Sequence, residues 1–295
     1  MDSLNLNIVN SNSHNVKKIA FAGNGHGGIV ALKSLQHFFT QIDIITNDNN
    51  ILNMLRNSDI VVKDIQDSTA HLVICAGYHS IIPKDTLANK IIINTHPSLL
   101  PKYRGMHSLV WAMLNFEKEI GFTIHLMNEY IDDGDILEQF KIVYQNQTSH
   151  EIMCLFDDYV EKNLGRVVVD FITKKIQPLK QNRTNASWVA KRNITDCLID
   201  YNRSNQFINM FFRALVRPYP LPMIKIKDRL YEVVNHTIID MKYEMHNGRV
   251  INIENNEAYI KIQDGILVIK DLIDFDTKEK LSAGTILKMG QRLWK

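Results

Sequence analysis

Residues 91–105 read IIINTHPSLLPKYRG. The run opens with three β-branched isoleucines, which suits a strand buried on both faces of a sheet. Asn94 and His96 end this strand, and in open α/β sheets ligands bind beyond the carboxyl ends of strands. Pro97 and Pro101 prevent a helix from starting at once, because proline fixes φ and disfavours αR in the residue before it. The stretch therefore predicts a strand that leads into a shaped loop near a binding site.

A second strand is predicted at residues 121–127, GFTIHLM, after a segment of helical periodicity at 108–116. The acidic cluster DDGD, residues 132–135, follows it. An amide, an imidazole and a carboxylate thus come from Asn94, His96 and Asp132, and together they suit the transfer of a carbonyl-bearing group to an amine. An imidazole can accept the proton of the amine, and a carboxamide can donate to the oxygen that gains negative charge. The carboxylate can either tune the imidazole or relay a proton.

Two spaced motifs resemble the folate-dependent formyltransferases. They are Asn-x-His-Pro-Ser-Leu-Leu-Pro-x-Tyr-Arg-Gly and Gly-x-Thr-x-His with an Asp seven residues after that His. This family includes glycinamide ribonucleotide formyltransferase, methionyl-tRNA formyltransferase and enzymes that act on nucleotide-linked amino sugars. The resemblance covers most of residues 17–230 and implies Asn94, His96 and Asp132 as catalytic residues, with 10-formyltetrahydrofolate as cosubstrate. It implies a folate pocket formed by Tyr78, His79, Ile81, Ile82, Ile131, Asp135 and Ile136.

Residues 23–28 read GNGHGG and match G-x-G-x-x-G between a predicted strand, 18–22, and a predicted helix, 29–39. A dinucleotide site would also need an acid after the second strand. Asp48 is available there without being decisive, so an NAD(P)-dependent oxidoreductase is a second alternative. The resemblance places the acceptor near this turn. The residues predicted to bind a phosphate-bearing acceptor are Gly23, Asn24, Gly25, Arg104, Gly105 and His107.

Strands alternating with helices up to residue 127 predict an α/β fold with a doubly wound, mostly parallel, Rossmann-like sheet. Residues 1–16, rich in Asn and Ser, are predicted to form an N-terminal extension. Residues 17–185 would form the catalytic domain. Residues 186–295 would form a linker helix and a small β-rich domain that resembles the OB-like barrel of the longer formyltransferases.

The composition, 45% hydrophobic and 22% charged, is that of a soluble globular protein. No apolar run is long enough for a membrane helix, so we expect a cytoplasmic protein without a membrane partner. The three cysteines and eleven histidines show no metal-binding spacing, so no metal is expected.

A net charge of +2 and the lack of a basic stripe make tRNA an unlikely partner. The predicted acceptor is therefore a nucleotide-linked amino sugar, for example dTDP-4-amino-4,6-dideoxyglucose, used in surface polysaccharide (lipopolysaccharide O-antigen) synthesis. Methionyl-tRNA formyltransferase is the alternative. A homodimer is expected on the general ground that two-fold dimers are the commonest soluble oligomers.

Overall fold

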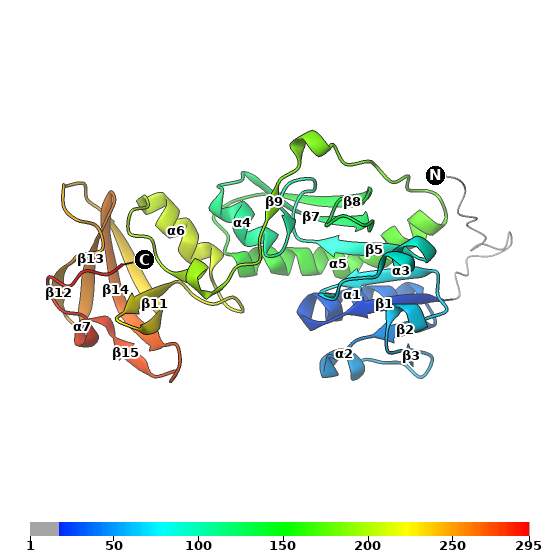
Figure 1. Ribbon diagram of the computed structural model, residues 1–295, viewed down its shortest axis with the longest axis horizontal. Helices are drawn as coiled ribbons and strands as arrows, with labels where there is room; N and C mark the ends of the chain where they lie inside the picture. Colours follow the sequence, from blue (N-terminus) through cyan, green and yellow to red (C-terminus); the bar gives the residue numbers. More distant parts are fainter. Residues whose placement is uncertain (1–17, 295) are drawn as a thin grey trace. The chain divides into compact units, whose positions relative to one another are not determined.

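A computed structural model describes residues 18–294 (Figure 1). The predicted extension, residues 1–16, lies outside the described residues. The chain forms two compact units, and the domain boundaries expected from the sequence stay predictions. Unit 1 contains the described residues up to Leu109, Lys118–Val143 and Met153–Ala190, and unit 2 contains Val110–Glu117, Tyr144–Ile152 and the residues from Lys191 onward.

Unit 1 is built on a seven-stranded sheet with the order β3-β2-β1-β4-β5-β7-β8. Strands β1, β2 and β4 are buried at every position. The apolar sequences of β1 and β4 predict this burial. Strand β2 also buries Asp43, whose carboxylate lies 3.0 Å from Nζ of Lys18. The mostly parallel α/β architecture is therefore confirmed. The strands are β1 (Ile19–Gly23), β2 (Ile42–Ile45), β3 (Ile60–Val61), β4 (Leu72–Ala76), β5 (Ile91–His96), β7 (Glu119–Leu126) and β8 (Ile136–Val143).

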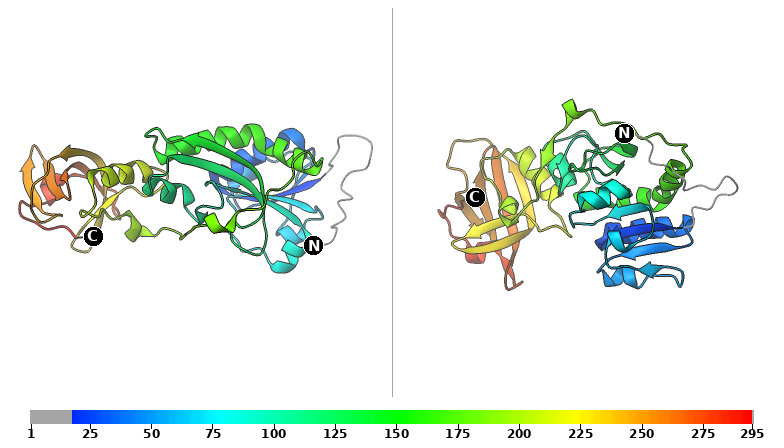
Figure 2. Two further views of the ribbon diagram at one scale, coloured as in Figure 1. Left: turned by 90° about the horizontal axis from the view of Figure 1, so that it is seen from above. Right: turned by 45° about the vertical axis from the view of Figure 1, so that its right-hand side comes forward.

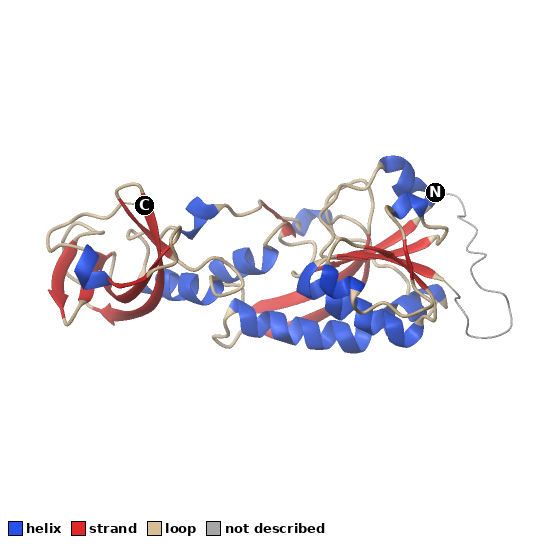
Figure 3. Cartoon of the chain, turned by 90° about the horizontal axis from the view of Figure 1, so that it is seen from below, coloured by secondary structure: helices blue, strands red, loops and turns tan. Residues whose placement is uncertain are grey.

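Helices α1 (Gly25–Phe38) and α5 (Ser149–Ile172) pack against each other beside the sheet. A Cβ atom on Gly165 would lie 2.3 Å from the ring of Phe38, so the close approach of the two helices requires glycine. Phe156 of α5 contacts Phe122 and Phe140 of the sheet. Figures 2 and 3 show α5 as a long helix that lies along the strands of this sheet.

A second apolar cluster lies among the side chains of alternate strand residues, including Ala20, Val73 and Cys75. Ile65 of the short 3-10 helix η1 (Ile65–Asp67) and Leu87 of α3 (Lys84–Asn89) pack against it. Because successive side chains of a strand point to opposite faces, both faces of the sheet are covered. Short helices α2 (Asn49–Leu52) and α4 (Ser108–Leu114) complete the connections.

Strand β7 pairs antiparallel with β5, so the prediction of parallel strands up to residue 127 is wrong at this position. A helix between two strands suggested a crossover, but the chain folds back instead. The antiparallel register places His125 directly opposite Asn94. It also places the carboxyl end of β7 away from that of β5, so the loop after β7 has to return to reach the end of β5.

Unit 2 contains an antiparallel sheet with the order β10-β11-β14-β13-β12, and β15 pairs with β14. Helix α6 (Asn205–Ala214) precedes the sheet and is capped by Ser204, whose hydroxyl accepts the N–H of Phe207. The β-rich character of this part of the chain is confirmed, and its OB-like identity stays a prediction. The strands are β10 (Met223–Ile226), β11 (Arg229–Asp240), β12 (Val250–Glu254), β13 (Glu257–Ile262), β14 (Gly265–Asp274) and β15 (Lys280–Ser282), with α7 (Ala283–Ile286) after them.

Among residues 18–294, no helix has the length and apolar character needed to cross a bilayer.

Candidate active site

The carboxyl half of β5 carries Asn94 and His96, and the register with β7 adds His125. The amide Nδ2 of Asn94 lies 3.3 Å from Nε2 of His125. The loop after β5 is shaped by Thr123, whose hydroxyl donates to the carbonyl of Ser98 (2.6 Å) and accepts the N–H of Leu100 (3.2 Å). The sequence prediction of a shaped loop at residues 97–105 agrees with this bonding.

Asp132 lies between the two imidazoles. One carboxylate oxygen is 3.5 Å from Nδ1 of His96 and the other is 3.6 Å from Nε2 of His125. The N–H of Gly105 donates to the same carboxylate at 2.8 Å. The structure therefore brings together Asn94, His96 and Asp132, the three residues that sequence reasoning singled out.

The loop that carries Asp132 folds back tightly onto β7. Asp132 has a positive φ of 49°, and a Cβ atom on Gly134 would lie 1.9 Å from the carbonyl oxygen of Leu126, so this approach is open only to glycine. Gln181 clamps the loop because its Nε2 donates to the carbonyls of Asp132 (2.8 Å) and Gly134 (2.7 Å). This return places the carboxylate of Asp132 beside β5 despite the antiparallel direction of β7.

The hydrogen bonds of the two histidines indicate their tautomers. Nε2–H of His96 donates to the carbonyl of Tyr103 at 2.9 Å, which leaves Nδ1 of His96 facing Asp132 as the proton-accepting nitrogen. Nδ1–H of His125 donates to the carbonyl of Leu126 at 2.7 Å, so Nε2 of His125 accepts the amide N–H of Asn94. His125 thus orients Asn94. Sequence reasoning did not include it in the site, although its place in the motif Gly-x-Thr-x-His was the available signal.

Burial lowers the pKa of His125 to about 4, and the nearby His96 also lowers it, while Asp132 raises it. Between pH 4 and 6.5 the unfolded chain binds a proton at this position and the folded chain does not, so the free energy of unfolding falls as pH falls. We expect His125 to contribute a loss of about 3 kcal/mol between pH 7 and pH 4. Urea unfolding at pH 7, 5.5 and 4 should show a weaker pH dependence for His125→Gln than for the natural chain. Equal slopes for the two proteins would contradict a neutral buried imidazole.

A cavity of about 240 Å³ opens beside these residues and is lined by Asn94, His125 and Asp132. Four of the predicted folate residues line the same cavity, namely Tyr78, Ile81, Ile82 and Ile131. The side chains of Ile81 and Ile131 are 96% and 70% exposed, so two loops offer apolar surface at its mouth. His96 is 5% exposed and lies behind Asp132 rather than in the wall.

The other predicted folate residues do not line this cavity. Ile136 is buried at the start of β8, where its backbone exchanges hydrogen bonds with Leu179. The carbonyl of Asp135 accepts the N–H of Leu126 at 2.8 Å. Both residues therefore hold the end of the loop, and His79 lies outside the wall. His107, predicted on the acceptor side, also lies outside it.

The glycine turn is occupied by a carboxylate of the chain itself. The N–H of Gly25 donates to Asp48 at 2.8 Å, and this bond holds the pKa of the Asp48 carboxyl below its usual value. A Cβ atom on Gly23 would lie 2.3 Å from the carbonyl of Ala76, so this glycine serves strand packing. Asn24 accepts hydrogen bonds from Thr46 and Asn47. A phosphate at this helix terminus would meet a negative charge, which disfavours the predicted anion site and the dinucleotide reading alike.

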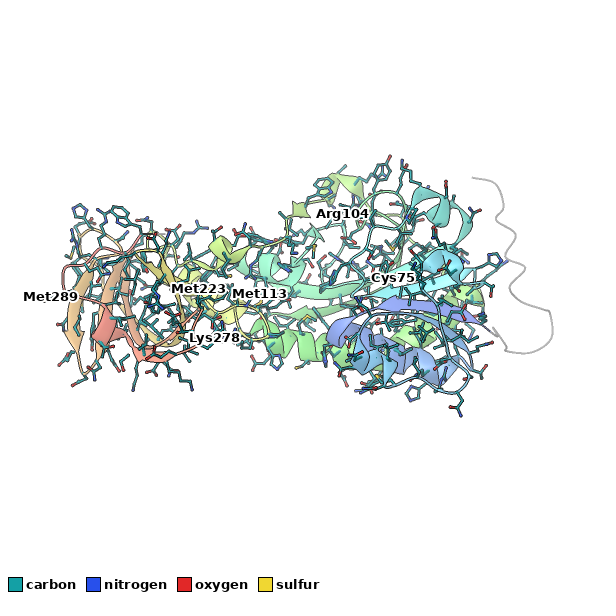
Figure 4. All side chains as sticks on the ribbon, turned by 60° about the horizontal axis from the view of Figure 1, so that its bottom comes forward. Cys75, Arg104, Met113, Met223, Lys278 and Met289 are labelled. Atoms are coloured by element: carbon teal, nitrogen blue, oxygen red, sulfur yellow. The ribbon has the colours of Figure 1, made fainter. Side chains whose placement is uncertain are left out.

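Arg104 is also engaged within the chain. Its Nη1 lies 2.6 Å from a carboxylate oxygen of Asp133, and both side chains are 3% exposed. Its Nη2 donates to Gln181 at 2.6 Å. Figure 4 labels Arg104 among the loops of unit 1. Arg104 therefore fastens the loop that carries Asp132, and Gly105 holds Asp132 directly, in place of the phosphate contacts predicted for both.

Asp133 has two cationic partners, Arg104 and Arg183. Burial opposes its ionisation, but the hydrogen bonds from Arg183 and the charge of Arg104 prevail and hold the pKa of this carboxyl below its usual value. The two adjacent acids of the cluster thus differ. Asp133 is tied to arginines, and Asp132 reaches the cavity and the histidines.

Asp133→Asn is expected to lower the free energy of unfolding by about 3–5 kcal/mol, because it leaves the Arg104 guanidinium buried without its counter-charge. Urea unfolding at pH 7 measures the change. Asp158→Asn is the control, since the Asp158–Lys162 pair is exposed and should contribute at most about 1 kcal/mol. Equal losses in the two variants would contradict the buried role of Asp133.

Within residues 18–294, no group of three or more His, Cys, Asp or Glu side chains is arranged to hold a metal ion.

Comparison with known proteins gives two family matches. Residues 6–168, more than half of the chain, match the model described as formyl transferase, and residues 193–290 match the formyl transferase C-terminal domain. The methionyl-tRNA formyltransferase of Finegoldia magna is 31% identical over 240 residues, which cover 78% of this chain and 73% of that protein. Relatives from Clostridium and Campylobacter with the same name are 25–29% identical.

Solved structures show the same fold at lower identity. The methionyl-tRNA formyltransferase of Clostridium thermocellum superposes with a TM-score of 0.58 at 20% identity, covering 84% of this chain and all of that one. The N-formyltransferase of Helicobacter canadensis, in complex with folinic acid and dTDP-3-aminofucose, gives 0.61 at 18% identity and covers 86% and 98%. The chain belongs to the formyltransferase family and is an enzyme that transfers a formyl group, with 10-formyltetrahydrofolate as its cosubstrate.

Proposed function

We propose that this enzyme formylates the amino group of methionyl-tRNA. The observation that carries the proposal is the sequence similarity to methionyl-tRNA formyltransferases, which extends over 78% of the chain at 31% identity. The match of residues 193–290 to the C-terminal domain of the family supports it.

The predicted acceptor, a nucleotide-linked amino sugar, is corrected by these relatives. Amino-sugar formyltransferases occur among the structural neighbours at 18–22% identity, a level that supports the fold alone. The prediction relied on the lack of a basic stripe and on the small net charge of the whole chain, which hides an uneven distribution. Residues 191–295 carry 17 Lys and Arg against 13 Asp and Glu, a net charge of +4, whereas residues 1–190 carry 17 against 19. A cationic segment at residues 191–295 suits a polyanionic acceptor. Family membership also removes the basis for the oxidoreductase alternative.

The site geometry supports a mechanism in which Asp132 and His96 act in series. The amino group of the acceptor attacks the formyl carbon, and an amide N–H of Asn94 donates to the oxygen that becomes negative. Asp132, which lines the cavity, takes the proton of the amine, and Nδ1 of His96 stands 3.5 Å behind it to share that proton. The bond from the formyl carbon to the folate nitrogen then breaks, and the proton returns to that nitrogen.

The folate pocket is proposed at the cavity beside Asn94, with Tyr78, Ile81, Ile82 and Ile131 in its wall. The apolar, exposed side chains of Ile81 and Ile131 suit the faces of a flat heterocyclic ring, since an apolar cleft with a few polar groups is typical of cofactor sites.

An acceptor panel tests the proposed function. The purified protein is incubated with 10-formyltetrahydrofolate and either methionyl-tRNA, uncharged initiator tRNA or a nucleotide-linked amino sugar, and the products are identified by mass. We expect N-formylmethionine after hydrolysis of the tRNA ester and no change in the other two acceptors. Formylation of the sugar without formylation of methionyl-tRNA would overturn the proposal.

A further inference from the structure

A second cavity, of about 450 Å³, lies across the segment 129–133 from the cavity beside Asn94. The two cavities share Glu129, Tyr130 and Ile131 in their walls. The second cavity is mostly apolar and shares only Ile131 with the four wall residues named above for the folate pocket. Its remaining lining residues are Arg104, Asp133, Arg183 and Trp188.

Two aromatic rings at this cavity are open to solvent. Trp188 is 67% exposed and Tyr130 is 58% exposed. The guanidinium of Arg104 lies 5.7 Å from the ring centroid of Trp188, and that of Arg183 lies at the same distance from the ring of Tyr130. Exposed rings backed by arginine are the surface on which nucleic-acid bases stack.

The charge of the cavity suits an anionic ligand. Arg104 and Arg183 share a single buried counter-ion, Asp133, so the three groups together carry one positive charge. The acid at the rim, Glu129, is paired with Lys84 at 3.1 Å. The Arg183 side chain is 70% exposed and remains accessible to a phosphate. The buried Nε of Arg104 has no hydrogen-bond partner among the described residues.

Two short paired strands connect Trp188 to the carboxylate of Asp132. In β9 (Trp188–Val189), Trp188 pairs with Arg104 of β6 (Arg104–Gly105), and Val189 pairs with Gly105. The N–H of Gly105 donates to Asp132. A ligand stacked on Trp188 is therefore positioned relative to the group that takes the amine proton.

We propose that the pocket formed by Tyr130, Ile131, Arg183 and Trp188 binds the nucleobase and phosphate of the nucleotide that carries the acceptor amine. The inference rests on the proposed function, in which this nucleotide is the 3′-terminal adenosine of methionyl-tRNA. The base stacks on Trp188, Arg183 faces the phosphate, and the ester-linked amino acid extends past segment 129–133 toward Asp132.

Direct binding and acceptor kinetics test the inference together. Titration calorimetry with adenosine monophosphate should show binding to the natural chain that Trp188→Ala weakens about tenfold and Trp188→Phe largely preserves. Trp188→Ala should raise KM for methionyl-tRNA about tenfold with little change in kcat, and should leave transfer to methionine methyl ester, which lacks a base, unaltered. Trp294→Ala, at a tryptophan of similar exposure (64%) in unit 2, is the matched control.

The outcomes separate the two claims. Binding of adenosine monophosphate through Trp188 without transfer to methionyl-tRNA would retain the pocket and overturn the proposed function. Transfer to methionyl-tRNA that is equally efficient in Trp188→Ala, or that falls equally for the methyl ester, would overturn the pocket. Loss of binding in both Trp188→Ala and Trp188→Phe with an unchanged unfolding transition would also refute stacking, since phenylalanine retains an aromatic face.

Discussion

Asp132→Asn is expected to lower kcat for formyl transfer by about 10³-fold while leaving the free energy of unfolding nearly unchanged. The asparagine side chain fills the same space and can still accept the N–H of Gly105. It cannot take the proton of the amine, and it offers no negative charge to the His96 imidazole 3.5 Å away.

Single-turnover rates with saturating donor and acceptor measure this loss. Asp133→Asn, the neighbouring isosteric change, gives the opposite pattern, with lowered stability and residual transfer in the molecules that stay folded. Near-normal turnover in Asp132→Asn would remove this carboxylate from the mechanism.

Asn94→Ala is expected to lower kcat by about 10²–10³-fold, because it removes the amide that faces the developing oxyanion. KM for either substrate should change little, since the bond strengthens only as the oxygen gains charge. Initial-rate kinetics separate the two parameters. Asn163→Ala is the control, because its amide donates to a carbonyl within α5 away from the cavity. A rise in KM with unchanged kcat would show that Asn94 binds substrate rather than the transition state.

Much of the architecture around the site could be predicted from local sequence. The isoleucine run of β5, the prolines after it and the helical periodicity at 108–116, where α4 forms, each indicate one structure. The direction of β7 could not be predicted, because a loop and a short helix can lead either to a crossover or to a return. Secondary-structure propensity does not distinguish a crossover from a return. The pairing of Asn94 with His125 nevertheless depends on which of the two paths the chain takes.

The proposed catalytic residues Asn94, His96 and Asp132 were accessible from sequence because a long motif and a distant acid agree in spacing. Gln181, Arg183 and Trp188 were not, because they reach the site only after the segment beyond α5 returns to the loop of Asp132. The glycine turn was misleading for a physical reason, because Asp48 already accepts the N–H of Gly25 that the motif would offer to a phosphate. The sequence shows that Asp48 follows β2, but it does not show the bond from Asp48 to Gly25.

The net charge of the whole chain is a poor guide to the acceptor. A net charge of +2 for the whole chain and the lack of a basic stripe argued against nucleic acid, although the charges divide unequally at residue 191. Charge counted by predicted domain would have weakened that argument.

The most direct test is the transfer of isotopically labelled formyl carbon from 10-formyltetrahydrofolate to methionyl-tRNA, measured side by side for the natural chain and Asp132→Asn. We expect label in the methionyl amide at a catalytic rate for the natural chain and a rate about 10³-fold lower for the variant. Absence of labelled methionyl-tRNA with the folded natural chain, or equal rates for the two proteins, would contradict the proposed function and the role of Asp132.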